Sequence, residues 1–367
     1  MASFTNLCHS IADLRQLIRY HDSYLPFLRY STVVVSIVTC LVGLVGNALV
    51  ICFLGFVMKK HKSKYWFLNL AIADFFFLLS LPFHAIAAFK GTWPFGDHVC
   101  KLFLFSMTAN VYASVLILTS LNIIRVLSVA QPMFHLKFIS KRVSFWICSI
   151  IWFITILSSL LVFYYSGEVK IGEFVVCTYH GSKTLDTAVT KNRYNESSGN
   201  ATRDVSDIYT MFGSYFKQCS SHVCCGGEEA LGIWDQMKFT SNQFVIPFLI
   251  IGYFIPLSIV IICNITIVVH VRKSKTINTH RLYRTVVAII VVYFITWTPL
   301  VIAETALFVI VLKMNFLALF YILQFMPLFI SIACTNNCLN PIFYVLNGGQ
   351  MRTELCDFIN SFRNIKK

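Results

Sequence analysis

Charged residues are scarce in this chain of 367 residues, since only 13% of them are Asp, Glu, Lys or Arg. Soluble globular domains usually carry about 25% charged residues, so this composition excludes an ordinary soluble domain. The sequence also shows no nucleophile with a nearby base and no spacing typical of metal ligands, which argues against an enzyme. Inverted repeats are not apparent either, which argues against a transporter or a channel.

Hydrophobic residues instead make up 57% of the chain, and the mean hydropathy is +0.71. A bilayer core about 30 Å thick is crossed by roughly 20 apolar residues in a helix. The pattern therefore predicts an all-α membrane protein, a bundle of seven transmembrane helices over residues 31–346. We expect the spans at 31–57, 66–89, 99–124, 143–166, 240–269, 285–312 and 314–346.

Shorter segments flank the predicted bundle. Residues 1–30 carry charges where a cleaved leader would be apolar, so we expect a tail outside the membrane. Residues 347–367 contain apolar side chains at helical spacing and predict a short amphipathic eighth helix on the membrane surface. Those apolar residues are Met351, Leu355, Phe358 and Phe362.

Basic residues cluster in the connections after the first, third and fifth spans, and none of these three connections contains an acid. By the positive-inside rule they face the cytoplasm, which places the N-terminus outside a plasma-membrane protein. The net charge of +14 is therefore a signal of topology and a docking surface for membrane lipids or an acidic partner. Nucleic acid is not an expected partner.

The connection at 167–239 is the one large polar segment, and it holds nine of the sixteen acids. Two glycosylation sequons begin there, at Asn195 and Asn200, which agrees with an outside location. Cysteines of the outer segments can form disulfides there, but their spacing does not say which of them pair. These cysteines are Cys8, Cys100, Cys177, Cys219, Cys224 and Cys225.

Polar residues recur inside the spans, where hydrocarbon disfavours them. Asp74 lies in the second span, Asn110 and Ser114 are one turn apart in the third, and Asn336 and Asn340 are one turn apart in the seventh. This oxygen-rich set could hold sodium at Asp74. The alternative is that these side chains only hydrogen-bond one another between helices.

Several short motifs recur in a familiar order and spacing. The chain resembles the rhodopsin-like G-protein-coupled receptors over about residues 31–362. The motifs are Gly46-Asn47, residues 68–74, Trp93-Pro94-Phe95-Gly96 before Cys100, Trp152, Pro256, residues 296–299 and residues 340–344. Stretches 112–116, 125–132 and 284–287 are most similar to the chemoattractant branch, especially leukotriene B receptors, with formyl-peptide and anaphylatoxin receptors close behind.

The resemblance implies a receptor for an extracellular chemoattractant-type ligand, a lipid mediator or a peptide, that acts on a heterotrimeric G protein at the cytoplasmic face. It implies a disulfide between Cys100 and Cys177, and it makes the set around Asp74 an allosteric sodium pocket, with no other cofactor. It also implies a set of activation switches. These are Arg125, Trp297, Pro299, Pro341 and Tyr344.

Two positions depart from the family pattern. Ile124 stands where the family has an aspartate beside Arg125, and Asn264 stands where it usually has a tyrosine. Both changes affect residues that the family uses for coupling. The alternative reading is therefore a decoy receptor of the same fold that binds and internalises its ligand without signalling.

Apolar residues with a few polar points line the outer thirds of the spans, as in a ligand pocket. Met107 occupies the position where amine receptors carry an aspartate, which argues against a biogenic amine. Glu304 could anchor a cationic or hydroxyl-bearing ligand, or it could simply reach up to extracellular water. The expected lining is His84, Met107, Phe248, Glu304, Gln324, Phe325, Met326 and Ile330.

The orientation yields a first prediction. Because Asn195 and Asn200 lie in the acid-rich outer segment, glycosidase treatment of the protein from transfected cells should increase its electrophoretic mobility. The double variant Asn195→Gln/Asn200→Gln should migrate like the treated protein. A wild-type protein that shows no shift would contradict the orientation.

Overall fold

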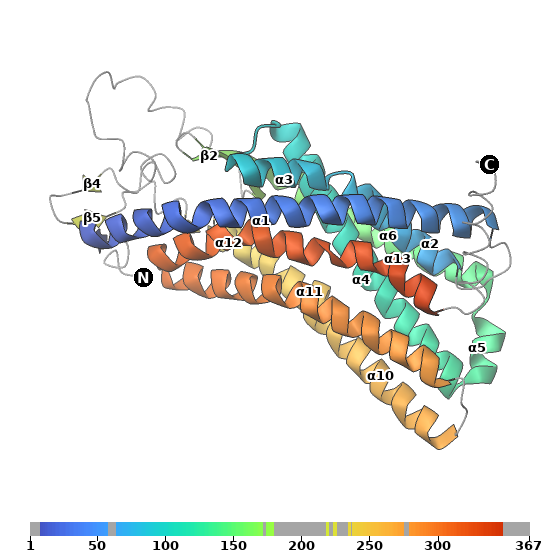
Figure 1. Ribbon diagram of the computed structural model, residues 1–367. Helices are drawn as coiled ribbons and strands as arrows, with labels where there is room; N and C mark the ends of the chain where they lie inside the picture. Colours follow the sequence, from blue (N-terminus) through green and yellow to red (C-terminus); the bar gives the residue numbers. More distant parts are fainter. Residues whose placement is uncertain are drawn as a thin grey trace.

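The computed structural model describes residues 8–57, 64–171, 174–179, 218–219, 223–225, 234–235, 237–274 and 279–347. Within these ranges, seven helical segments are long and apolar enough to cross a membrane, which confirms the predicted seven-helix bundle (Figure 1). Asn195, Asn200 and the predicted eighth helix lie outside the described residues.

The spans are formed by helices that run roughly along one direction (Figure 1). A short helix, α5 (Pro132–Phe138), joins the third span to the fourth. The spanning helices are α1 (Ile11–Cys52), α2 (Lys64–Leu78) with α3 (Leu81–Lys90), α4 (Asp97–Ala130), α6 (Lys141–Tyr164), α10 (Ile255–Ser274), α11 (Thr279–Lys313) and α12 (Phe316–Cys334) with α13 (Asn336–Asn347). Three π-helical segments extend them: η2 (Phe53–Val57) after α1, and η3 (Ser241–Val245) and η4 (Phe248–Phe254) before α10.

The first helix is longer than the sequence pattern predicts. It begins at Ile11, well before residue 31, because Ser10 caps it: Ser10 Oγ accepts a hydrogen bond from the backbone N–H of Asp13 at 3.1 Å. Only the part from Tyr24 onward is apolar enough to span a membrane. The prediction located the apolar span but missed the polar turns that precede it.

Two spans that were predicted as continuous are each divided into two helices. The second span is interrupted after Leu78, and the seventh at Thr335. At both breaks a hydroxyl donates to the carbonyl three residues earlier: Ser80 Oγ to Phe77 O at 2.7 Å, and Thr335 Oγ1 to Ile332 O at 2.6 Å. Such local bonds compete with the regular helical ladder.

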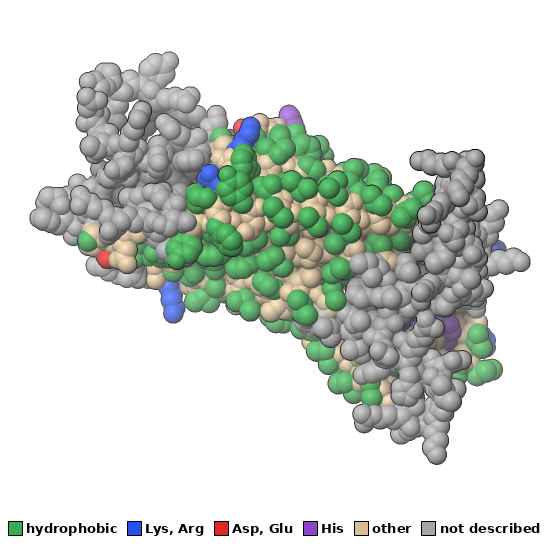
Figure 2. Space-filling model, viewed as in Figure 1, with side chains coloured by type: hydrophobic (Ala, Val, Ile, Leu, Met, Phe, Trp, Pro, Cys, Tyr) green, Lys and Arg blue, Asp and Glu red, His purple; other side chains and the backbone are tan. Residues whose placement is uncertain are grey.

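Helix α4 lies at the centre of the bundle and packs against α2, α6 and α10. Leu70 of α2 and Ile117 of α4 are fully buried in the core that these helices share. Outward-facing side chains such as Phe153, 69% exposed, are also apolar. Figure 2 shows hydrophobic side chains over the visible face of the bundle, the surface expected of helices that face hydrocarbon.

Strands lie at the end of the bundle where α1 begins, whereas α13 finishes at the other end (Figure 1). Strands β2 (Ser166–Ile171) and β3 (Phe174–Tyr179) form an antiparallel hairpin. Strands β1 (Cys8–Ser10), β5 (Val223–Cys225) and β4 (Gln218–Cys219) form a second sheet, in that spatial order. The 167–239 connection therefore meets the N-terminal segment at one end of the bundle.

Candidate functional site

Asp74 lies fully buried on α2, in the middle of the bundle. Its Oδ1 accepts hydrogen bonds from Asn110 Nδ2 at 2.9 Å and Ser114 Oγ at 3.3 Å, both on α4. Its Oδ2 accepts from Asn340 Nδ2 of α13 at 2.7 Å. The structure therefore brings four of the five residues of the predicted set together around one carboxylate.

Two further asparagines extend this cluster. Asn337 Nδ2 donates to Asn110 Oδ1 at 3.0 Å, and Asn47 Nδ2 of α1 donates to the backbone carbonyl of Asn337 at 2.9 Å. Asn336, the fifth member of the predicted set, is buried but makes no hydrogen bond to Asp74 among the described residues. The cluster thus joins α1, α2, α4 and α13.

The donor types of this cluster suit a small hard cation. Carboxylate, hydroxyl and amide oxygens are the ligands that such ions prefer, and Asp74, Ser114 and Asn110 supply one of each kind. In the described arrangement, three side-chain donors already satisfy the carboxylate, as in interhelical hydrogen bonding. The residues therefore fit sodium chemically, with Asp74 as the charged ligand, and they also form an interhelical network of their own in which Asn47 Oδ1 has no partner among the described residues.

Trp297 lies outward of this cluster, on α11, and is 6% exposed. Its ring contacts Phe248 at 6.0 Å and Tyr293 at 5.9 Å between centroids. Met326 and Ile330 of α12 pack against the same apolar cluster. Pro299, two residues further along α11, removes a backbone donor from the helix interior and allows it to bend there.

The remaining residues of the expected pocket belong to neighbouring clusters. Met107 packs with the buried core around Leu78 and with the core around Trp93. His84 is buried, stacks on Phe103 at 6.0 Å, and lies 3.1 Å from the carbonyl oxygen of Pro327. Phe325 and Phe329 stack at 6.1 Å.

Glu304, Gln324 and Trp297, whose indole Nε1 has no partner among the described residues, carry unsatisfied polar atoms in this outer region. No described group hydrogen-bonds to Glu304 Oε2, which is shielded from solvent, or to the amide oxygen and nitrogen of Gln324. Gln324 is only 8% exposed. An unsatisfied buried polar group costs about 1–3 kcal/mol of stability. These residues therefore place unpaired hydrogen-bond donors and acceptors in an otherwise apolar region.

Tyr179 of β3 brings the 167–239 connection into contact with α4 and with Phe244. Its hydroxyl hydrogen-bonds to Thr108 of α4, and its ring stacks on Phe244 at 4.7 Å. Burial raises the pKa of the Tyr179 phenol to about 12, and the charge of Glu304 acts in the same direction. The phenol is therefore protonated at physiological pH and can donate a hydrogen bond.

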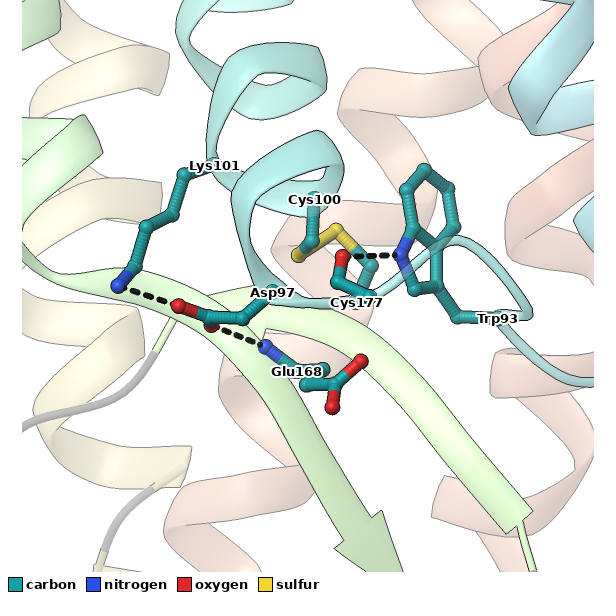
Figure 3. Close-up of polar contacts among 7 residues, drawn as sticks. Trp93, Asp97, Cys100, Lys101, Glu168 and Cys177 are labelled. Atoms are coloured by element: carbon teal, nitrogen blue, oxygen red, sulfur yellow. Dashed lines mark hydrogen bonds and ion pairs between the residues drawn. A yellow bond between two sulfur atoms is a disulfide. The ribbon is translucent and has the colours of Figure 1, made fainter.

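The β2–β3 hairpin is fastened to the outer end of α4 (Figure 3). A disulfide joins Cys100 to Cys177, the pair that the resemblance implied. The backbone N–H of Glu168 donates to Asp97 Oδ1 at 3.1 Å, while Asp97 Oδ2 pairs with Lys101 Nζ at 2.6 Å.

The Trp93-Pro94-Phe95-Gly96 motif holds a turn beside this hairpin. Trp93 Nε1 donates to the carbonyl of Gly96 at 3.1 Å, and the backbone N–H of Trp93 donates to Val175 O of β3 at 2.7 Å. Gly96 has φ of 82°, a left-handed conformation that favours glycine. The motif therefore positions both the start of α4 and strand β3.

The half of the bundle predicted to face the cytoplasm contains the other predicted switches. No ion pair joins Arg125 to a carboxylate within the described ranges, and Ile124 packs against the apolar core of α2, α4 and α6. Asn264 donates to Val260 O at 2.6 Å. Pro341 of α13 lies so close to Gly46 that a Cβ there would stand 3.1 Å from Pro341 Cγ. Tyr344 belongs to α13, but its side chain is outside the described part.

Sequence reasoning missed the roles of Tyr179 and Asn337. Tyr179 follows Cys177 by two residues, and alternate residues of a strand share a face. Val175, Cys177 and Tyr179 all pack against the same buried cluster. This spacing of two residues could have indicated that Tyr179 lies on the same face of the strand as Cys177. For Asn337, a spacing of three from Asn340 also places both on one helix face.

This architecture defines a class of protein: a membrane protein with seven spanning helices, a buried polar cluster around Asp74 and a disulfide-bonded hairpin at one end of the bundle. The chain matches the family 7 transmembrane receptor (rhodopsin family) over residues 46–195 and 207–344, and it belongs to that family. Membership of a receptor family confirms that the chain is not an enzyme.

Curated relatives show which receptors of this family the chain is similar to. Chemerin-like receptor 1 of Rattus norvegicus is 28% identical over 317 residues, 86% of this chain and 75% of the relative. Chemerin-like receptor 1 of Sus scrofa is 30% identical over 322 residues, 88% of this chain and 78% of the relative. The C3a anaphylatoxin chemotactic receptor of Rattus norvegicus is 26% identical over 421 residues, 88% of this chain and 87% of the relative. The chain is thus a G-protein-coupled receptor of the chemoattractant-type family.

The contrast between Glu304 and the Asp74 cluster yields a prediction. Glu304→Leu should raise the free energy of unfolding of the ligand-free, detergent-solubilised receptor by about 1–3 kcal/mol, because it removes a buried polar atom without a partner. The increase should appear as a higher unfolding temperature. Asn110→Leu, the matched variant, should lower stability because it breaks two interhelical hydrogen bonds. Equal losses in the two variants would show that Glu304 is satisfied within the receptor.

Proposed function

We propose that this protein is a plasma-membrane receptor that binds a chemoattractant-type ligand at the pocket covered by β3 and passes the signal to a heterotrimeric G protein. The observation that carries the proposal is the shielded, unsatisfied Glu304 Oε2, on the same helix as Trp297 and its apolar cluster. Clefts of this kind, mostly apolar with a few convergent polar groups, are typical ligand sites. The N-terminus lies outside in this proposal.

The chemistry of the pocket favours a ligand with an apolar part and a donor group. The apolar part would contact Phe248, Met326 and Ile330, and the donor would reach Glu304. The names of the relatives refer to chemerin and to the C3a anaphylatoxin, so we favour a peptide or protein ligand of that kind. A leukotriene is the lipid alternative, because the sequence motifs resemble leukotriene B receptors.

A ligand panel on transfected cells tests this function directly. The panel contains chemerin, C3a and leukotriene B4, and each ligand is read for G-protein activation and for uptake in parallel. Activation by any of them supports the receptor proposal and identifies the ligand class. Uptake without activation supports the decoy alternative, which the departures at Ile124 and Asn264 motivate.

Basal signalling provides a second test of coupling. Arg125 lacks a carboxylate partner among the described residues, so the inactive packing is less strongly held in this proposal. Charge interactions of partly buried groups are worth roughly 1–3 kcal/mol, and about 1.4 kcal/mol is tenfold in a two-state equilibrium. Ile124→Asp should therefore lower basal G-protein activity severalfold, and Asn264→Tyr should raise it.

The control for Ile124→Asp is Ile124→Asn, which removes the same apolar contacts with the core but adds no charge. Its basal activity should fall less than that of Ile124→Asp. If the wild type and all three variants reach the surface and bind ligand, yet none activates a G protein, the decoy reading replaces the signalling one.

Sodium is the allosteric ion that we propose for the Asp74 cluster. Replacing N-methylglucamine chloride by sodium chloride at constant ionic strength should raise the unfolding temperature of the purified receptor. An ion at ten times its dissociation constant contributes about 1.4 kcal/mol. Asp74→Asn should abolish the difference, and Asp97→Asn, at the outer end of α4, should preserve it. A wild type indifferent to sodium would leave Asp74 as an interhelical hydrogen-bonding group only.

A further inference from the structure

The small sheet β1–β5–β4 joins the N-terminal segment to the 167–239 connection, here called the loop. Its backbone register places Cys8 opposite Cys225, His9 opposite Cys224, and Cys219 opposite Cys224. Three of its eight residues are thus cysteines of the loop, and a fourth is Cys8. This concentration of cysteine in so short a sheet has no role in the proposed ligand site.

Cys8 is disulfide-bonded in the structure, and its partner is not Cys100 or Cys177, because these two bond each other. Six other cysteines are free thiols: Cys40, Cys52, Cys148, Cys263, Cys334 and Cys338. The sequence then leaves Cys219, Cys224, Cys225 and Cys356. Cys356 follows the seventh span and therefore falls on the cytoplasmic side of an odd-numbered bundle.

Strand geometry distinguishes the three loop cysteines. Facing residues of an antiparallel pair have Cα atoms about 4.5–5.5 Å apart, within the range of about 4.4–6.8 Å that a disulfide requires. Cys225 faces Cys8 directly. Cys219 lies two strands away, because β5 separates β4 from β1, and two strand spacings amount to about 9.6 Å. Cys224 faces His9 instead, and successive residues of a strand alternate between its two faces.

We propose that Cys8 bonds Cys225 and that Cys219 bonds Cys224, so that two cross-strand disulfides lie on opposite faces of this sheet. Each bond forms when two thiols lose two protons and two electrons. A disulfide-bearing oxidoreductase of the secretory pathway accepts them by thiol–disulfide exchange while the chain folds.

These bonds would tie the loop to a second helix. β1 ends at Ser10, which caps α1, so a bond at Cys8 fixes the loop to the outer end of α1. The same loop is already fixed to α4 through Cys177. The loop would then bridge α1 and α4 covalently across the pocket side of the bundle, and a ligand would enter beneath a cap held at both ends.

Peptide mapping of surface-expressed, full-length receptor tests the pairing. Free thiols are alkylated, and the protein is digested with trypsin without reduction. Cys8 lies in the peptide that ends at Arg15, and the three loop cysteines lie together in the peptide between Lys217 and Lys238. These two peptides should appear as one unalkylated species that separates on reduction. An alkylated Cys8 peptide in the wild type would overturn the proposal.

Two matched double variants identify the partner. Cys219→Ser/Cys224→Ser retains Cys8 and Cys225, and its two peptides should remain joined. Cys219→Ser/Cys225→Ser retains Cys8 and Cys224, and both thiols should be alkylated. Surface expression and size-exclusion behaviour show whether each variant folds. The assignment would be refuted if the two peptides were joined equally in both variants, or only in the variant that retains Cys224. If either variant fails to fold, fragmentation of the joined wild-type peptides identifies the cysteine bonded to Cys8.

Discussion

The carboxylate of Asp74 imposes the constraint on which the membrane-spanning part of this receptor depends. A buried carboxylate needs donors, and in hydrocarbon no water supplies them. Asn110, Ser114 and Asn340 donate to it, and Asn337 and Asn47 extend the network. Because these residues come from four helices, satisfying one charge fixes the relative positions of α1, α2, α4 and α13. Close packing around the network, as at Gly46 against Pro341, follows from the same approach of helices.

The outer half of the bundle differs from the Asp74 cluster because it contains buried polar atoms without hydrogen-bond partners. There Glu304 and Gln324 are shielded from solvent yet lack partners among the described residues. Such groups destabilise the ligand-free protein, and sites that bind ligands commonly carry this cost. The β2–β3 hairpin is held at the start of α4 by the Cys100–Cys177 disulfide, by the bond from the Trp93 N–H to Val175 O and by the bond from the Glu168 N–H to Asp97 Oδ1. These unsatisfied groups are the reason for proposing a ligand site in this half of the bundle.

In the proposed mechanism, the half of the bundle that faces the cytoplasm lacks an ion pair at Arg125, and α11 can bend at Pro299. Arg125 has no carboxylate partner within the described ranges, since Ile124 packs into the apolar core. Pro299 interrupts the hydrogen-bond ladder of α11 beside Trp297, at the floor of the pocket. In the proposed mechanism, a ligand that alters the packing around Trp297 acts on α11, whose other end is predicted to face the cytoplasm. The equilibrium shifts only by the difference in ligand affinity between the two packings.

Hydropathy and charge alone determined the seven spans and the membrane class, because a spanning helix needs a long apolar run wherever it packs. The polar residues of the Asp74 cluster were also recognisable, since helical spacing puts Asn110 and Ser114 on one face. Which groups meet was decided only by the tertiary structure: Asn337 rather than Asn336 joins the cluster, and Tyr179 reaches Thr108 of α4 from a distant loop. Helix breaks at Ser80 and Thr335 depend on local hydrogen bonds that hydropathy does not encode. Contacts between segments far apart in the chain depend on how helices and loops pack, and no local pattern specifies that.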